Sequence, residues 1–307
     1  MNLRHLLLPA LAAAALALAA CGDEDASEPL PTPNPSPAFP VTITDDNGVE
    51  VTLEEAPERI VALAPSFVEV LFAVDAGDTI VAADENSDYP AEAASIPKIS
   101  GFEPSVEGIV SYEPDLVLLT FDPGGLVDAL DGVGIDSLFL AAPATVDGAM
   151  EQIETLGLAT GHSTDATKVV ERMRTEIHAI VAAIPTDGGP RVYHEVDNTY
   201  YSTGPGSFIH DLYVTLGARN IAEATGEPFP QLSAETIIQA DPEVIILADE
   251  FAGESAETVA ARSGWGGISA VVASRVHTVD PNIISRPGPR LVDALAILAT
   301  LLYPEAF

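Results

Sequence analysis

The sequence predicts an α/β protein made of two similar lobes, each built on a mostly parallel sheet and joined by one long rigid α-helix, with a ligand cleft between the lobes. Short runs rich in Val, Ile and Leu alternate with helix-like stretches, a pattern typical of parallel sheets covered on both faces. A segment of the first half recurs in the second, and an amphipathic stretch separates the two copies. The expected boundaries are 41–163 for the N-terminal lobe, 164–185 for the linking helix and 186–307 for the C-terminal lobe.

The first twenty residues, 1–20, have the outline of a secretory signal peptide. Arg4 and His5 precede fifteen residues of Leu, Ala and one Pro, fewer than the roughly 20 apolar residues that a membrane-spanning helix needs. The small residues Ala19 and Ala20 suit a cleavage site. We therefore expect the chain to be exported and this segment to be removed.

Cys21 is the single cysteine of the chain and directly follows that site. The stretch "LAAC" (18–21) resembles the bacterial lipoprotein signal, in which the thiol is acylated and becomes the mature N-terminus; the alternative is a cysteine inside an ordinary signal peptide. Thioether-linked diacylglycerol supplies two chains, enough for stable anchoring to a lipid bilayer. Residues 21–40 then form a lipidated Cys and Pro-rich linker, because the alternating prolines of "PLPTPNPSPAFP" favour an extended spacer.

The composition limits the choice of partners. The formal net charge is -35, from 47 acidic and 12 basic residues, so nothing in the chain could replace the counterions on a phosphate backbone, and nucleic acid is excluded. Anionic headgroups would repel the protein as well. The charge suits a solvated acidic surface, and the hydrophobic content of 47% is enough for a large core in one or two domains.

The elements of the two lobes follow in order along the chain. The segment "VTITDDNGVEVTL" (41–53) predicts a hairpin with Asn47-Gly48 as a type I′ turn. Apolar runs that predict buried strands lie at 59–64, 79–84, 115–120 and 137–141 in the first lobe and at 191–196, 243–249 and 275–280 in the second.

The internal repeat aligns "SVEGIVSYEPDLVLL" (105–119) with "SAETIIQADPEVIIL" (233–247). Each copy predicts a short helix capped by its Ser with an acid in the first turn, then a proline that ends the helix, then a buried strand. The repeat is the observation that implies two related lobes.

The segment 163–185 predicts the linking helix. Ser163 or Thr164 is expected to cap its start, and Pro185 to end it. About 20 helical residues span about 30 Å, the width of a small domain. Bending such a connector would break helical hydrogen bonds, so we expect little lobe closure on ligand binding. Its apolar stripe at helical spacing consists of Val169, Val170, Met173, Ile177, Ile180, Val181 and Ile184.

Several stretches together resemble one known family. They are "APERIVALAPSFVEVLFAVDAGDTIVA" (56–82), "SDYPAEA" (87–93), the "EPDLVLL" repeat, "STGPGSFIHDLYVTLGARNIA" (202–222), "FPQLSAETI" (229–237) and "SRPGPRLVDAL" (285–295). In combination, over residues 59–307, they are similar to the substrate-binding lipoproteins of cobalamin and iron-siderophore ABC importers. "SDYP" and "FPQLS" are most similar to the cobalamin branch, while the N-terminal hairpin occurs more widely in the siderophore branch.

The resemblance implies a receptor without enzymatic activity or cofactor. Such a protein is expected to be a monomer outside the cytoplasm, anchored to the cell membrane. It would capture a corrinoid, a ferric chelate or haem between its lobes and deliver the ligand to an ABC permease and ATPase complex. The resemblance also implies docking on the permease through one acid from each lobe, and Glu69 and Asp211 match those positions; the alternative is that both are ordinary solvated acids.

Loops that follow the predicted strands are expected to face one another across the cleft, because ligands of open parallel sheets lie beyond the carboxyl ends of the strands. A large planar ligand suits aromatic and aliphatic faces with few polar anchors. The candidate ligand-binding residues in these loops are Ser66, Phe67, Tyr89, Phe102, Tyr200, Tyr201, Ile283 and Arg286.

The choice of ligand depends on charge and on aromatic residues. Ferric catecholates are strongly anionic and would need several converging cations, but Arg286 and Arg290 are the only basic pair near a predicted cleft loop. Cobalamin receptors of the family tend to present tryptophans where this chain has Phe102 and Ile283, and its single Trp265 is expected to be a packing residue. We favour a corrinoid, with a ferric siderophore or haem as the alternative.

A hydrolase is the alternative from a different class. Ser207, His210 and Asp211 lie together in "GPGSFIHD", but residues this close on one helix cannot line up as nucleophile, base and acid. No catalytic residue is therefore expected. Ser207 is better interpreted as the N-cap of a helix whose free amides could accept an anionic group of a ligand.

Histidine placement argues against a zinc receptor. No histidine falls between His5 and His162, so the first lobe could supply no imidazole to a metal ion between the lobes, and no metal site is expected. His194 and His210 could be axial ligands to iron or cobalt in a bound ligand, or ordinary histidines with hydrogen-bond partners.

Overall fold

The computed structural model describes residues 39–186 and 188–307. The expected signal peptide (1–20), Cys21 and nearly all of the linker 21–40 lie outside the described residues. Within the described ranges we find no membrane-spanning helix, since even α5 (Ser163–Ala183), which has 21 residues, is polar over most of its surface.

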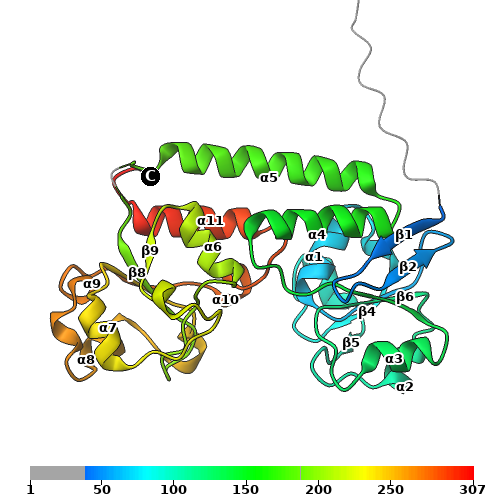
Figure 1. Cartoon of the computed structure of the whole chain (residues 1–307), viewed down its shortest axis with the longest axis horizontal. Helices are drawn as coiled ribbons and strands as arrows, with labels where there is room; N and C mark the ends of the chain where they lie inside the picture. The colour runs from blue at the N-terminus through cyan, green and yellow to red at the C-terminus, as the bar shows by residue number, and fades with distance from the viewer. Residues whose placement is uncertain (1–38, 187) are drawn as a thin grey trace, which may run out of the picture. The chain divides into compact units, whose positions relative to one another are not determined.

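The N-terminal lobe is built on a five-stranded sheet in the order β5-β4-β3-β6-β7, with all neighbours parallel (Figure 1). Its strands are β3 (Ile60–Ala62), β4 (Ile80–Asp84), β5 (Lys98–Ile99), β6 (Leu116–Leu119) and β7 (Asp136–Phe139). Its helices are α1 (Pro65–Ala73), α2 (Val106–Val110), α3 (Leu126–Asp131) and α4 (Val146–Ala159), with short 3-10 turns at Gly77–Thr79 and Ala91–Ser95. Each of the four strands expected in this lobe is present, and β5 is an addition.

The C-terminal lobe repeats the plan with a four-stranded parallel sheet in the order β11-β10-β8-β9. Its strands are β8 (Arg191–Glu195), β9 (Arg219–Asn220), β10 (Val244–Leu247) and β11 (Val276–Thr278). Its helices are α6 (Phe208–Thr215), α7 (Ala234–Ala240), α8 (Ala256–Ala261), α9 (Ser269–Val272), α10 (Pro281–Ile284) and α11 (Leu291–Leu302), with 3-10 turns at Glu223–Thr225, Glu250–Ala252 and Trp265–Gly267. The expected α/β fold with two mostly parallel sheets is confirmed.

The repeat has the same local geometry in both lobes. Ser105 accepts a hydrogen bond from the Gly108 amide at the start of α2, and Ser233 accepts one from the Thr236 amide at the start of α7. The residue before each proline adopts a left-handed conformation, with φ of 49° at Glu113 and 48° at Asp241. The shared turn leads each helix into a fully buried strand, β6 or β10.

The hairpin of β1 (Val41–Thr44) and β2 (Glu50–Leu53) is present, but its turn differs from the expected type I′ turn. Only Gly48 of the Asn47-Gly48 pair has a positive φ. The Asp45 amide donates to the Val49 carbonyl and the Gly48 amide to the Asp45 carbonyl, which defines a three-residue loop with a left-handed glycine. The reason is Asp45, whose buried carboxylate accepts from the amides of Asn47 and Val49 and so holds the wider loop.

Helix α5 extends across both lobes above α4 and α11 (Figure 1). Two details of its prediction were wrong. His162 occupies the N-cap position without a capping side chain, so Ser163 is the first helical residue rather than the cap. Val181 is 39% exposed, because it lies at the edge of the stripe, whereas Ile180 and Ile184 in the same turn pack against the hydrophobic core.

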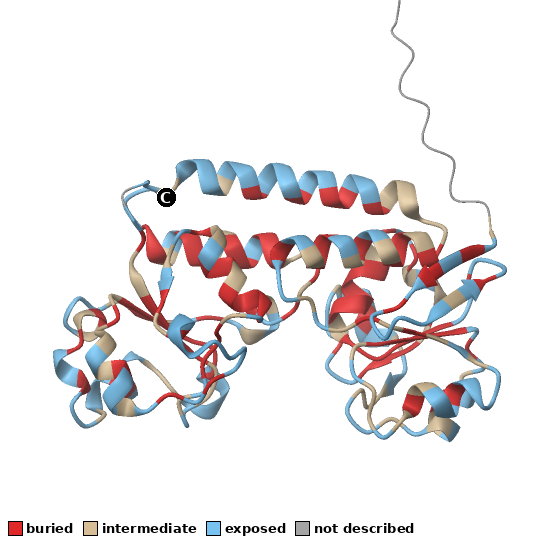
Figure 2. Ribbon diagram, in the orientation of Figure 1, coloured by how far each residue is buried: buried red, intermediate tan, exposed pale blue. Residues whose placement is uncertain are grey.

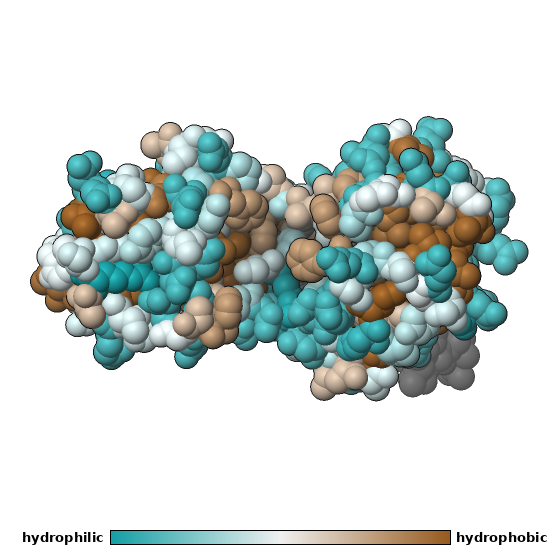
Figure 3. Space-filling model, turned by 90° about the horizontal axis from the view of Figure 1, so that it is seen from below, coloured by the Kyte–Doolittle hydropathy of each residue, from teal (hydrophilic) through white to brown (hydrophobic). Residues whose placement is uncertain are grey.

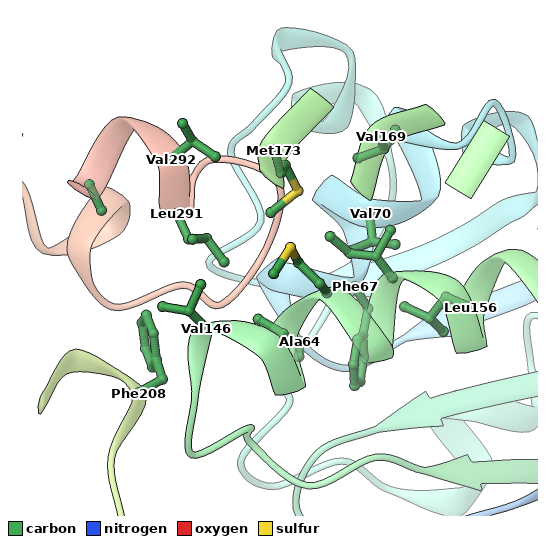
Figure 4. Close-up of a cluster of buried hydrophobic side chains, with 14 of the residues drawn as sticks. Ala64, Phe67, Val70, Val146, Leu156, Val169, Met173, Phe208, Leu291 and Val292 are labelled. Atoms are coloured by element: carbon green, nitrogen blue, oxygen red, sulfur yellow. The ribbon is translucent and has the colours of Figure 1, made fainter. Parts of the chain in front are cut away.

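One hydrophobic core runs through both lobes. Helix α5 buries only the side that faces α4 and α11 (Figure 2). Side chains from α1, α4, α5, α6 and α11 belong to a single cluster with residues of both sheets, part of which Figure 4 shows around Met173. Each lobe adds a smaller cluster on the outer face of its sheet. The lobes are therefore packed against each other as well as linked by α5.

Candidate ligand-binding site

A buried ion pair joins the two lobes beneath α5. Glu69, on α1 of the N-terminal lobe, is 3% exposed and receives a bidentate pair of hydrogen bonds from Arg290, which begins α11 of the C-terminal lobe. Arg290 Nε donates to Glu69 Oε2 at 2.9 Å and its Nη2 donates to Oε1 at 2.6 Å. The hydrogen bond from Arg290 to Glu69 is the main reason that the pKa of Arg290 is raised. We call Glu69, Arg286 and Arg290 the interlobe clasp.

Arg286 completes the clasp through four acceptors. It donates to Glu69 Oε1 at 3.3 Å, Asp88 Oδ1 at 2.6 Å, the Asn86 carbonyl at 2.9 Å and Asn282 Oδ1 at 2.8 Å. Burial by itself would raise the pKa of Asp88, but the hydrogen bond and charge of Arg286 outweigh burial and lower it. Arg286 is thus occupied by protein partners on both lobes, so the expectation that it binds ligand has no support in this arrangement.

The two acids expected to dock on a permease make contacts within the protein. Glu69 cannot meet an arginine of another protein without breaking the clasp. Asp211, on α6, accepts a hydrogen bond from the Val146 amide at 2.7 Å and so joins the C-terminal lobe to the first turn of α4 in the N-terminal lobe. Both acids are interlobe contacts rather than freely exposed side chains.

The remaining N-terminal candidates do not gather at one point. Phe67 is 1% exposed and packs in the shared core (Figure 4), and Ser66 is buried in the first turn of α1. Tyr89 lies under Arg290, whose guanidinium carbon is 4.1 Å from the ring centroid. Phe102 follows β5 and is 73% exposed. Among the described residues, no ring contact or hydrogen bond joins its side chain to Ser66, Phe67 or Tyr89.

The candidate ligand-binding residues of the C-terminal lobe also lie in different environments. Tyr200 stacks on Trp265 at 5.7 Å between ring centroids, and Arg262 lies against both rings, so Tyr200 is part of the packing of this lobe. Trp265 is fully buried, as expected of a packing residue. Tyr201 is exposed, and Ile283 is partly buried against the shared core.

A cavity of about 450 Å³ lies where the carboxyl ends of β8 and β10 meet the N-terminus of α6. Ala142 and Pro143 of the N-terminal lobe close one side, so the cavity is shared between the lobes. Its other lining residues are His194, Val196, Gly206, Ser207, Phe208, Ile209, Phe229, Ala248, Phe251, Pro281, Ser285 and Pro287. None of these described residues carries an acidic, lysine or arginine side chain, in a protein of net charge -35.

The N-terminus of α6 is built by the Gly204-Pro205-Gly206 turn. Gly206 has a φ of 94°, and a Cβ on Gly204 would lie 2.4 Å from the Glu227 carbonyl oxygen, so both positions require glycine. Ser207 then caps the helix, as expected, by accepting from the His210 amide at 3.3 Å. Its hydroxyl donates to the Gly204 carbonyl at 2.8 Å, so both of its recorded hydrogen bonds are local to the turn and the start of α6.

The two histidines considered as axial ligands, His194 and His210, differ in their partners. His210 Nδ1 lies 3.1 Å from Asn220 Nδ2, so it has a protein partner. His194 is fully buried in the cavity wall; its Nδ1 pairs with the Tyr213 hydroxyl at 2.7 Å, while its Nε2 has no partner among the described residues. Burial lowers the pKa of His194 to about 4, so the ring is neutral at pH 7. Among the described residues, no three His, Cys, Asp or Glu side chains converge as they would at a metal site.

The face opposite α5 is hollowed between the two halves of the molecule (Figure 3). Hydrophobic side chains gather beside this hollow on the half that contains the C-terminal lobe. Two of the exposed apolar residues that line the cavity are Phe229 and Phe251, with exposures of 58% and 80%. An apolar, uncharged cavity with large exposed aromatic side chains can bind an organic ligand with an extended apolar face.

Sequence reasoning missed Phe229 and Phe251. Phe251 and Ala248 follow β10, and Ala142 and Pro143 follow β7. The rule that ligands lie beyond the carboxyl ends of strands would have found these positions if it had been applied to the runs 137–141 and 243–249. Phe229 follows no strand closely; it begins the stretch "FPQLS", which carried the family resemblance but was not taken as a ligand contact.

Behind the cavity, a cluster of acids surrounds one arginine. Arg262 donates to Glu195 through two hydrogen bonds, one of 2.6 Å, and to Glu254 at 2.7 Å. Asp249 is also fully buried, but neither of its carboxylate oxygens has a partner among the described residues. Burial, and then the charges of Glu195 and Glu254, raise the pKa of Asp249 to about 7.

Comparison with known proteins identifies the family. Residues 60–283 match the family model described as "Periplasmic binding protein". The chain belongs to the periplasmic binding protein family. This confirms the resemblance found in the sequence.

This periplasmic binding protein has relatives of several kinds. It is 32% identical over 279 residues to the uncharacterized ABC transporter substrate-binding lipoprotein YvrC of Bacillus subtilis, covering 88% of this chain and 87% of that one. It is 32% identical over 277 residues to the cobalamin-binding protein of Halobacterium salinarum, covering 87% and 75% of the two chains. Its fold also matches a structure titled as an ABC-type Fe3+-hydroxamate transport system from Saccharomonospora viridis, with a TM-score of 0.71, 25% identity and coverage of 86% and 99%.

The clasp can be tested by neutralising its carboxylate. Glu69→Gln leaves Arg290 and Arg286 buried without their shared anion, so we expect the free energy of unfolding to fall by about 3–5 kcal/mol in urea titrations. Glu151→Gln, on the exposed side of α4, is the matched control and should change it by less than about 0.5 kcal/mol. An equal, small effect of both substitutions would contradict a stabilising clasp.

Asp249 predicts a pH dependence of stability. Its pKa is higher in the folded protein, at about 7, than the ordinary value of 3.8, so the folded state binds the extra proton and is destabilised as pH rises from about 4 to above 7. Asp249→Asn should therefore be more stable than the wild type at pH 8, and the difference should shrink towards pH 4 when unfolding is followed by Trp265 fluorescence. Glu250→Gln, exposed on the next residue, should show no such trend. A difference independent of pH would mean that Asp249 titrates normally.

Proposed function

We propose that this protein is the substrate-binding component of an ABC importer and that it captures a corrinoid in the cavity between its lobes. The uncharged cavity is the observation that carries the choice of ligand. In a chain with 47 acids, the cavity-lining residues among those described leave no ionised side chain facing the ligand. A neutral or weakly charged molecule with large apolar faces is the ligand class that such walls favour.

The clasp supports the same choice, because it engages the two arginines that could otherwise bind an anionic ligand. A strongly anionic ferric catecholate would need several arginines or lysines around it. Arg286 and Arg290 were the available pair, and both are held by Glu69, with Arg286 also held by Asp88. The identity to the cobalamin-binding protein of Halobacterium salinarum supports a corrinoid independently of the cavity.

A ferric hydroxamate is the second candidate. The structural relative from Saccharomonospora viridis is titled for Fe3+-hydroxamate transport, and a hydroxamate chelate of low charge also suits an uncharged cavity. The two candidates differ in shape more than in charge, so direct binding measurements must distinguish them.

The partners follow from the same proposal. The ligand would pass to an ABC permease and its ATPase. The mature chain would lie outside the cytoplasm as a monomer, anchored by acylated Cys21. The apolar run before Cys21, which is typical of a signal peptide, supports the anchor, and so does the relative from Bacillus subtilis that is named a lipoprotein.

Titration of the purified protein without its lipid tests the ligand. Cyanocobalamin, haem and a ferric hydroxamate would be added separately, with visible absorbance and calorimetry as readouts. We expect cyanocobalamin to bind most tightly, and Phe251→Ala to weaken it about tenfold or more, because truncating an aromatic contact in a binding site typically costs more than 1 kcal/mol. Val272→Ala, on the exposed surface of α9, is the control. Phe102→Ala distinguishes the sites: a greater loss there than at Phe251 would locate the ligand on the N-terminal lobe.

Fractionation tests the anchor. In a bacterial host, Cys21→Ala should move the protein from the membrane fraction to the soluble fraction and abolish labelling by a radioactive fatty acid, since two acyl chains are what hold it at the bilayer. Ser27→Ala in the same linker should change neither. Membrane recovery that persists without Cys21 would mean that another segment anchors the chain.

A further inference from the structure

His194 lies in the cavity wall, and only one of its two ring nitrogens has a hydrogen-bond partner among the described residues. On β8 it lies beside Ile246 of β10, and its ring packs against Tyr213 of α6 at 5.9 Å between ring centroids. Nδ1 pairs with the Tyr213 hydroxyl, and Nε2 is buried without a partner among the described residues. An unpaired polar atom buried in an apolar wall is costly unless something else completes its hydrogen bond.

The contact with Tyr213 determines which nitrogen carries the proton. Tyr213 is fully buried, and among the described residues His194 is the one partner of its hydroxyl. Burial raises the pKa of Tyr213, so the phenol keeps its hydrogen. If that hydrogen is donated to Nδ1, the ring's own proton lies on Nε2. The opposite tautomer would leave the phenol hydrogen unpaired as well as Nε2, so the first arrangement is preferred.

The N-terminus of α6 adds donors to the same cavity. Its first two residues, Phe208 and Ile209, line the cavity, and neither of their amides has a hydrogen-bond partner within residues 39–186 and 188–307. Together with Nε2–H, these amides make three unpartnered donors on residues that line the cavity. A cation or a metal centre would meet the wrong charge and no lone pair at such donors, whereas an oxygen acceptor can pair with them.

We propose that His194 positions the ligand by donating a hydrogen bond from Nε2 to an amide carbonyl oxygen at the ligand's edge, assisted by the α6 amides, and that it does not coordinate a metal in the ligand. The inference rests on the proposed function and specifies how the same cavity recognises its ligand. A corrinoid carries peripheral amides of this kind. Tyr213 is the positioning residue that fixes the tautomer.

The binding test compares three variants with cyanocobalamin as the probe. His194→Leu removes the donor and should weaken binding about 10- to 100-fold, whereas His194→Gln, which keeps an N–H donor, should stay within about fivefold of the wild type. His178→Gln, on the exposed side of α5, is the matched control and should not change the affinity. Equal affinities of the Leu variant and the wild type would overturn the proposal.

Spectra test the tautomer and the absence of coordination without any substitution. Long-range proton–nitrogen NMR of the ring-labelled protein should detect the His194 proton on Nε2, and a proton on Nδ1 would overturn the proposal. Aquacobalamin should keep its visible bands on binding, because imidazole coordination to cobalt would shift them. The NMR signals of His194 should show the same neutral ring from pH 5.5 to 8, since its pKa is about 4.

The two proposals fail in different ways. If the wild type binds none of cyanocobalamin, haem and a ferric hydroxamate, the proposed function is wrong, and the NMR result still reports on the tautomer. If the wild type binds cyanocobalamin but bound aquacobalamin shows a spectrum characteristic of imidazole on cobalt, the function stands and the role of His194 as a hydrogen-bond donor is wrong.

Discussion

A carboxylate buried between two arginines holds the halves of this protein in one arrangement. Glu69 belongs to the first helix of the N-terminal lobe, and Arg286 and Arg290 both precede α11, the helix that Arg290 caps. An ion pair out of water is favourable only when its geometry satisfies every charge, and in the clasp both carboxylate oxygens and both guanidinium groups have partners. The clasp and the shared apolar core under α5 act together, so the position of the cavity follows from how the lobes meet.

The distribution of charge separates the outside of the molecule from its binding surface. Acids cover the exterior, while the cavity is lined by aliphatic, aromatic and small residues with neutral polar groups. The arginines that could have changed this balance are used elsewhere: Arg286 and Arg290 in the clasp, and Arg262 with Glu195 behind the cavity. Selection among ligands then depends on shape, apolar area and a few hydrogen-bond donors more than on net charge.

Much of the architecture could be predicted from the sequence, because buried parallel strands appear as apolar runs and the repeat revealed two lobes. The strands β5 (Lys98–Ile99) and β9 (Arg219–Asn220) could not be predicted. Each is only two residues long and begins with a basic residue, so neither shows an apolar pattern. The site was predicted less well. The rule that ligands lie beyond strand ends placed Ser66 and Arg286 near the boundary between the lobes. Only the three-dimensional structure shows that Arg286 is bound by Glu69 and that Phe67 is buried in the core. Phe229 lines the cavity because of the course of the loop that carries it, and the local sequence pattern does not predict that course.

The shared core also affects how the chain is made. Helix α11 supplies Leu291 and Val292 to the same cluster that holds Phe67 and Met173 (Figure 4), and it ends five residues before the C-terminus. The first lobe therefore cannot complete its interior until α11 has been synthesised. A nascent chain with an unfinished interior stays loosely structured and exposes apolar surface. Such a delay would keep the polypeptide competent for threading through a translocation channel, at the risk of aggregation if a premature stop removed the final helix.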